Sequence, residues 1–336
     1  MPLNQTSGFT DTTASDAIQS FFNRLLLERG IYDLIHNMPM MKSPLSQRQG
    51  RTMIFRRYET LGLATTALTE GTNPSSRSKT RTDVSATLSL YGDVIEDTDF
   101  LLLTQPEAVA TENVELLGQQ MGETIDQICR DAYAAATQIV YANGTSTLTV
   151  TQIVDKNDLD RAHRLMKNNK AKEFTPPIMA GQNIGTGPIS RAYWGLCHED
   201  VAFDLRHVDG FLLTAEYAKS GGAVAGEFGA DKNGFRFLSS PNGYYLAGAT
   251  GTTAAGTDVI NDSSFVRVYS LFLVGQNAIT GIDLESGNGG VIRHGFGTSG
   301  VSDPLNLRET VAWKKYFVST ILNNNFMCEL QTAASL

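Results

Sequence analysis

The sequence predicts an α+β protein of 336 residues, with one dominant helix and many strands. The helix is expected over residues 104–141, where apolar residues recur every three or four positions along one face. Strands are expected where apolar and polar residues alternate, at 52–58 and 84–92 and again over 310–322. A helix of that length would measure about 50 Å, more than one small core requires. We therefore expect it to serve as a spine for the other elements.

The first 44 residues precede the first strand pattern. Residues 1–16 are small and polar without periodicity, which is typical of a flexible arm. Residues 20–35 carry apolar side chains at helical spacing and predict a short amphipathic helix. An N-terminal arm and short helix over 1–44 are therefore expected to dock elsewhere, for example on another subunit.

A long hairpin is expected over residues 45–95. Between its two alternating arms, residues 70–81 have almost nothing to bury, so the hairpin should project from the core. From Lys42 to Tyr91 there are eight basic and three acidic residues, whereas the spine has six acidic residues and only Arg130 as a base. This contrast predicts pairing between copies, with ordinary solvated charge as the other interpretation. The candidate contact residues are Arg56, Arg57, Arg77, Lys79, Arg81, Glu112, Glu115, Glu123 and Asp126.

The spine helix has recognisable ends. Thr104 and Glu107 have the spacing of a capping box, and Asn143-Gly144 is a stop signal. Gly118 and Gly122 each cost about 1 kcal/mol relative to alanine inside a helix. They predict a face that packs closely against another element, with a kink near Gly118 as the alternative.

The second half of the chain reads as short elements around a glycine-rich stretch at 219–260. A shorter helix opens at Lys156 and is capped by Asn157 or Asp158, and another helical segment covers 199–206. Further strands are expected at 148–154, 176–181, 192–198, 236–238, 243–246, 266–275, 278–282 and 326–330.

Composition narrows the function classes. No apolar run approaches the 18 residues of a membrane span, and the N-terminus lacks the features of a signal peptide, so a protein made in the cytosol is expected. The three cysteines suit reduced core thiols better than disulfides or a metal cluster. The formal charge of −8 argues against a protein that grips nucleic acid by neutralising phosphates.

No motif predicts catalysis. Phosphate-binding loops, dinucleotide fingerprints, nucleophile elbows and Cys-x-x-Cys pairs are absent from the sequence. The best metal candidate is His198-Glu199-Asp200 with Asp204 and His207, but it lacks the spacing that places two imidazoles on one helical face. We predict no enzyme activity and no catalytic, cofactor-binding or metal residues.

Four groups of residues, in this order, resemble the major capsid proteins of tailed bacteriophages with the HK97-like fold, particularly the N4-type coat proteins. They are 50–57 with 65–71, 193–198 with 204–206, 226–229 with 234–237, and 302–306 with 313–314.

The resemblance implies a protein that assembles with copies of itself into pentamers and hexamers of an icosahedral shell. It implies an extended loop (45–95) over a neighbouring subunit, a peripheral domain (96–189 and 301–336, with spine helix 104–141) and an axial domain (190–300). It also implies a scaffolding protein, a portal and a decoration protein as partners, and enclosed double-stranded DNA. Assembly is expected in the host bacterial cytoplasm, with the virion capsid as the final location.

Two alternatives stay open. One is an encapsulin-like compartment shell, which shares the fold. The other is a two-domain enzyme or glycan-binding protein with its site in the glycine-rich module around His198 to His207.

Overall fold

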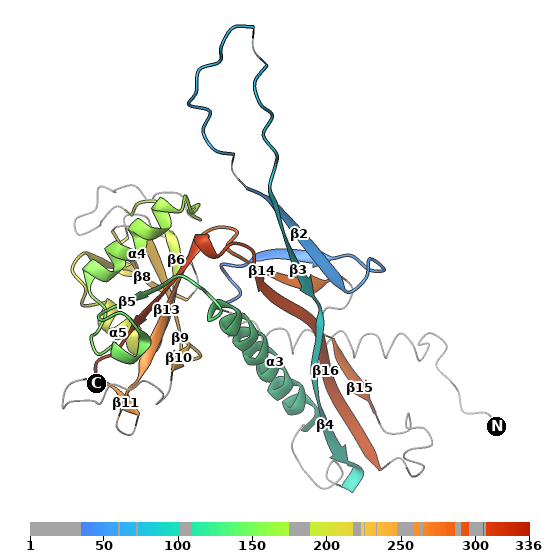
Figure 1. Cartoon of the computed structure of the whole chain (residues 1–336). Coiled ribbons are helices and arrows are strands. Elements are labelled where there is room, and N and C mark those ends of the chain that lie inside the picture. Colours follow the sequence, from blue (N-terminus) through green and yellow to red (C-terminus); the bar gives the residue numbers. More distant parts are fainter. Residues whose placement is uncertain are drawn as a thin grey trace.

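The computed structural model describes residues 35–59, 61–71, 73–100, 109–174, 189–217, 223–224, 226–232, 234–246, 259–262, 265–285, 290–295, 305 and 307–336 (Figure 1). The predicted arm, nearly all of the predicted short helix at 20–35, the capping box at Thr104 and the strand at 176–181 lie outside these residues. The α+β class is confirmed, since a few helices accompany many strands in two main, mostly antiparallel sheets.

One sheet has five strands and the other has eight. The first has the order β1 (Met41–Leu45), β14 (Ile279–Leu284), β16 (Arg308–Ile321), β15 (Val291–His294), with β4 (Ser89–Thr98) also paired to β16. The second has the order β5 (Ile139–Tyr141), β17 (Met327–Thr332), β13 (Val268–Val274), β6 (Tyr193–His198), β9 (Phe235–Ser240), β8 (Glu227–Asp231), β7 (Phe211–Leu213), with β10 (Tyr245–Leu246) on β13. A two-stranded ribbon, β11 (Asn261–Asp262) and β12 (Phe265–Val266), stands apart.

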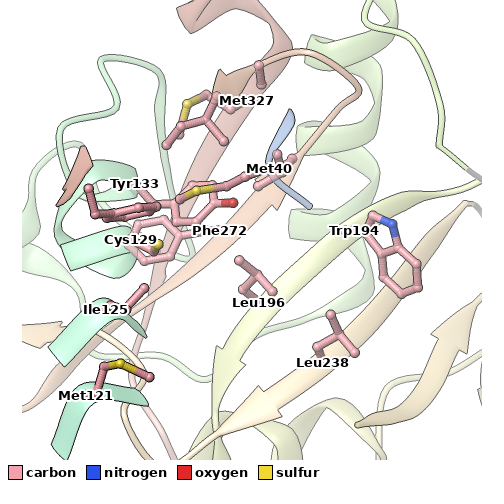
Figure 2. Close-up of a cluster of buried hydrophobic side chains, with 14 of the residues drawn as sticks. Met40, Met121, Ile125, Cys129, Tyr133, Trp194, Leu196, Leu238, Phe272 and Met327 are labelled. Carbon is pink, nitrogen blue, oxygen red and sulfur yellow. The ribbon is translucent and has the colours of Figure 1, made fainter. Parts of the chain in front are cut away.

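The long helix α3 (Val109–Tyr133) packs on both sheets. Its Gln120 accepts a hydrogen bond from Trp313 Nε1 of β16 at 3.0 Å, and its Tyr133 ring stacks on Phe272 of β13 with centroids 5.6 Å apart. Figure 2 shows Met121, Ile125, Cys129 and Tyr133 lining one side of this core. The helix runs unbroken through the buried Gly118 and Gly122, so the two glycines do not interrupt it.

The predicted C-terminal end of this helix is wrong. It ends at Tyr133 rather than Tyr141, and Ile139–Tyr141 forms β5, parallel to β17. Tyr133 is fully buried and donates a hydrogen bond to the His36 carbonyl at 3.0 Å. The β-branched and aromatic residues 139–141 then favour a strand once a sheet edge is available.

The hairpin is present. Its arms are β2 (Thr52–Tyr58) and β3 (Arg81–Thr87), which pair antiparallel from Thr52↔Thr87 to Tyr58↔Arg81. The second arm continues into β4 of the five-stranded sheet, so one continuous stretch joins the hairpin to the core. Figure 1 shows the loop beyond these arms projecting away from both sheets.

Helices α4 (Lys156–Asn168) and α5 (Glu199–Leu205) cover the face of the eight-stranded sheet opposite α3. The side chains of β6 alternate between the two faces of the sheet. Tyr193 and Cys197 pack with α4 and α5, whereas Trp194 and Leu196 pack with α3. The N-cap of α4 is Asp155, in a capping box with Asp158, and not Asn157 or Asp158 itself.

The predicted strand at 148–154 is also wrong. Thr147–Thr149 forms a short 3₁₀ turn, η2, in which the Thr149 hydroxyl donates to the Ser146 carbonyl at 2.8 Å. Within this stretch Ile153 makes a single bridge to Ala333. The side-chain hydroxyls compete with strand pairing for the local backbone groups.

The sheets do not follow the expected domain boundaries at 189/190 and 300/301. Strands β5 and β17 join the eight-stranded sheet, whereas β14 and β15 join the five-stranded one. The chain crosses between sheets from β13 to β14 through a turn at Asn277, which has φ 60°. It crosses back from β16 to β17 through the short 3₁₀ turn η4 (Asn324–Phe326).

The buried Glu329 of β17 makes stability depend on pH. Its carboxylate accepts hydrogen bonds from Ser270 Oγ at 2.6 Å and Gln331 Nε2 at 2.9 Å, yet burial raises its pKa above the usual value. The folded state therefore binds this proton more tightly than the unfolded state. The free energy of unfolding falls as pH rises from the unfolded pKa through the raised folded pKa.

We expect Glu329→Gln to remove this fall in the free energy of unfolding. At pH 7 the variant should be more stable than the parent, by more than the change of about 0.5 kcal/mol that is typical of surface substitutions. Urea unfolding at pH 5 and pH 7 measures it, with the exposed Glu216→Gln as the matched control. A variant that is less stable than the parent at pH 7 would contradict the assignment.

Candidate assembly surfaces

The basic residues of the hairpin arms have acidic partners within the hairpin. Arg56 Nε lies 2.9 Å from Asp83 Oδ1, and Arg81 Nε lies 3.7 Å from Asp83 Oδ2. Arg57 Nη2 lies 3.0 Å from Glu59 Oε1. The hydrogen bond from Arg56 lowers the pKa of Asp83. The Arg56–Asp83 pair therefore joins the two arms, whereas Arg57–Glu59 and Arg81–Asp83 each lie within one arm.

The distal loop (residues 61–80) exposes apolar side chains. Leu61, Leu63 and Leu68 are 54%, 86% and 76% exposed, in a stretch whose described residues form no helix or strand. Arg77 Nη1 donates to the Gly62 carbonyl at 2.5 Å, and Arg77 Nη2 donates to the Leu63 carbonyl at 3.4 Å. Arg77 thus ties the two limbs of the loop, while Lys79 makes no ion pair with the described residues. Clustered exposed leucines are typical of an interaction segment.

The predicted acidic residues of α3 separate into two groups. Glu112 and Glu123 are exposed, and Glu115 is half-buried. Asp126 is instead fully buried, and its selection as a contact between copies is wrong. Its carboxylate accepts from the His36 backbone N–H at 2.9 Å and lies 2.7 Å from His36 Nδ1. Asp126 therefore faces the core beside Ile125, where the chain around His36 covers it.

Sequence reasoning missed this His36–Asp126 pair. The two residues are 90 positions apart, and neither has a local motif. The only signal was the placement of an acidic residue directly beside the apolar stripe of a helix.

A hollow of about 650 Å³ lies between β5 and α4. Its apolar lining comes from Ile139, Val140 and Leu165, and its cationic lining from Arg161 and Arg164. A charge pattern in the sequence indicates this surface, because five Lys or Arg residues and no Asp or Glu occur between 161 and 172. They are Arg161, Arg164, Lys167, Lys170 and Lys172, all exposed.

The candidate metal residues do not converge. Asp204 is buried and accepts hydrogen bonds from the backbone N–H and hydroxyl of Ser335. His207 Nδ1 contacts the Phe203 carbonyl at 2.9 Å, and His198 Nδ1 lies 3.1 Å from Asp200. Within the described part of the chain, no three metal-binding side chains group together.

The three cysteines are buried and unpaired. Burial raises the pKa of each thiol, to about 12 for Cys328. These side chains therefore remain neutral thiols at physiological pH and are poor nucleophiles. None of the helices in the described ranges is long and apolar enough to cross a membrane.

Comparison with solved structures identifies the fold. The chain resembles the capsid of Ralstonia phage GP4 (TM-score 0.63, 12% identity, 90% of this chain and 88% of that one). It also resembles the capsid of cyanophage P-SCSP1u (TM-score 0.58, 13% identity, 91% and 88%) and the mature capsid of bacteriophage PhiM1 (TM-score 0.57, 11% identity, 99% and 90%). These likenesses confirm the predicted HK97-like fold.

Sequence comparison identifies the family. No curated protein sequence matches the chain. The family model described as "Phage capsid protein" matches residues 81–327, from the second arm of the hairpin to the first residue of β17. The chain therefore belongs to the phage capsid protein family, and it is a structural subunit of a virion shell.

Proposed function

We propose that copies of this chain form the pentamers and hexamers of an icosahedral shell that encloses double-stranded DNA. The family match supports a phage shell over a bacterial compartment or an enzyme. The N4-type assignment stays a prediction. The formal charge of −8 supports enclosing DNA without sequence-specific contacts.

Each part of the fold has a proposed place in the shell. The extended loop (45–95) lies over a neighbouring subunit. The eight-stranded sheet with α4 and α5 forms the axial part, and the five-stranded sheet forms the peripheral part, with α3 shared between them. This division replaces the boundaries expected from the sequence, because it keeps each sheet whole. Lys79, Glu112, Glu115 and Glu123 remain candidates for contacts between copies.

Further partners belong to the same proposal. A scaffolding protein and a portal start the shell, and a decoration protein binds the finished surface. Assembly takes place in the host bacterial cytoplasm, where the buried thiols of the described residues stay reduced.

The observation that carries the proposal is the exposed distal loop, because the described residues of its own chain leave its leucines uncovered. Replacing residues 59–80 by Asn-Gly would join the paired residues Tyr58 and Arg81 through a two-residue hairpin turn. We expect this variant to keep both sheets, with a Tm within a few degrees of the parent, and to form no shells. Circular dichroism and electron microscopy of the full expressed chain measure the two outcomes.

A second variant keeps the loop length and changes only its apolar side chains. Leu61, Leu63 and Leu68 would all become serine, and the same loss of shells is expected. Shells of normal size and yield from both variants would refute a role of the loop in assembly.

A further inference from the structure

The loop and the hollow have complementary chemistry. The first limb of the distal loop, residues 61–71 (the apolar limb), carries the three exposed leucines and Glu70. Glu70 is the only acidic residue between Glu59 and Asp83. The basic residues Arg77 and Lys79 lie on the other limb, and Arg77 is occupied by the Gly62 and Leu63 carbonyls. The apolar limb is therefore a leucine-rich segment with one carboxylate.

The hollow between β5 and α4 offers the matching surface. Ile139 and Leu165 supply apolar lining, and Arg161 and Arg164 supply positively charged lining. Arg161 Nη2 donates to the Tyr141 carbonyl at 2.5 Å and to Asp158 Oδ1 at 2.7 Å, which fixes its side chain at the rim. Arg164 makes no ion pair with the described residues. A volume of about 650 Å³ lies in the range of pockets that hold a drug-sized group, so several side chains fit.

The two surfaces lie apart within one chain. In Figure 1 the distal loop projects beyond the β2–β3 arms, and the unit that contains β5 and α4 lies below it to one side. One copy can therefore donate its loop while a second copy receives it. Such a contact uses different surfaces on the two partners, and it closes into a ring when the rotation between copies allows.

We propose that the apolar limb of one copy docks in the hollow between β5 and α4 of a second copy. The leucines cover Ile139 and Leu165, and the Glu70 carboxylate lies beside Arg164. This inference rests on the proposed shell function and names the receiving surface. It also explains why basic residues gather on the exposed side of α4 in a chain with a formal charge of −8.

Cysteine pairing tests the contact directly in the full chain. Leu68→Cys on the loop and Asn168→Cys at the hollow introduce two exposed thiols, whereas the native cysteines are buried. Mild oxidation of assembled particles should give a ladder of linked chains on non-reducing gels. The matched control combines Leu68→Cys with Glu216→Cys, an exposed position in the short 3₁₀ turn that follows β7, and should give no ladder.

Absence of a ladder for the first pair in intact particles would overturn the proposed receiving surface. It would leave the shell function standing, since particles would still have formed. A ladder of equal yield from both pairs would also overturn it.

A charge exchange gives a second readout if the cysteine variants fail to assemble. Glu70→Arg alone or Arg164→Glu alone should weaken association of two copies by about tenfold, as expected for a close charge pair at an interface. The double variant Glu70→Arg/Arg164→Glu should restore most of it. Analytical ultracentrifugation measures each association, and a double variant no better than the single ones would refute the pairing.

Discussion

Replacing Asp126 by alanine is expected to lower the free energy of unfolding by about 3–5 kcal/mol, because it leaves a buried histidine without its partner. The carboxylate binds both the backbone N–H and the ring Nδ1 of His36, and both side chains are almost completely buried. The Tyr133 hydroxyl holds the same residue through its carbonyl. Loss of Asp126 should therefore release the chain at His36 from α3. Urea unfolding of the unassembled protein, with limited proteolysis near residue 36, measures both effects.

Two controls separate the pair from its surroundings. Asp126→Asn keeps an acceptor for the His36 N–H, and a smaller loss of about 1–3 kcal/mol is expected. Asp131→Ala removes an exposed carboxylate of the same helix, which lies 2.9 Å from Arg130, and should change stability by no more than about 0.5 kcal/mol. Equal losses at positions 126 and 131 would show that the buried pair contributes nothing specific.

The second large effect is expected at Glu227 in the eight-stranded sheet. Glu227 pairs with Arg236 across β8 and β9, and both side chains are at most 5% exposed. Its carboxylate also accepts from the Tyr217 hydroxyl at 2.5 Å and from the Val224 N–H at 2.9 Å. Glu227→Ala should cost about 3–5 kcal/mol, because the buried Arg236 guanidinium loses the Glu227 carboxylate. Thermal and urea unfolding measure it.

A double-mutant comparison tests the reason for this loss. Arg236→Met removes the buried guanidinium, so Glu227→Gln/Arg236→Met should be more stable than Glu227→Ala alone. The Arg236 guanidinium also lies over the Trp194 ring at 5.0 Å, so some of its packing is lost with it. If the double variant is less stable than Glu227→Ala, the buried charge is not the cause.

Local periodicity was enough to predict the main elements. Alternation in 52–58 and 84–92 located the hairpin, because a two-residue period belongs to strands wherever they lie. The stripe through Val114, Leu117, Met121 and Ile125 located α3, since only a helix brings these residues to one face. The lack of burial potential between the arms also predicted that the loop would project.

Features that depend on distant partners could not be predicted in this way. Helix α3 ends at Tyr133 because the ring is held in the core and β17 recruits residues 139–141 into a sheet. Asp126 resembled a surface acid because its partner, His36, lies on another element. The hollow is shared by β5 and α4, and neither segment has a ligand-binding motif. The assignment of strands to sheets depends on distant partners too, since β14 and β17 each leave the sheet of their sequence neighbour.

Helix α3 has a mechanical consequence for a shell of many copies. Because one buried core joins this helix to both sheets, rotating one sheet against the other would open that core to water. The two sheets and α3 should therefore move as one rigid body. Differences in curvature between neighbouring positions of a shell must then be accommodated by bending of α3 or by movement of the projecting hairpin. The arms of the hairpin lie outside that core.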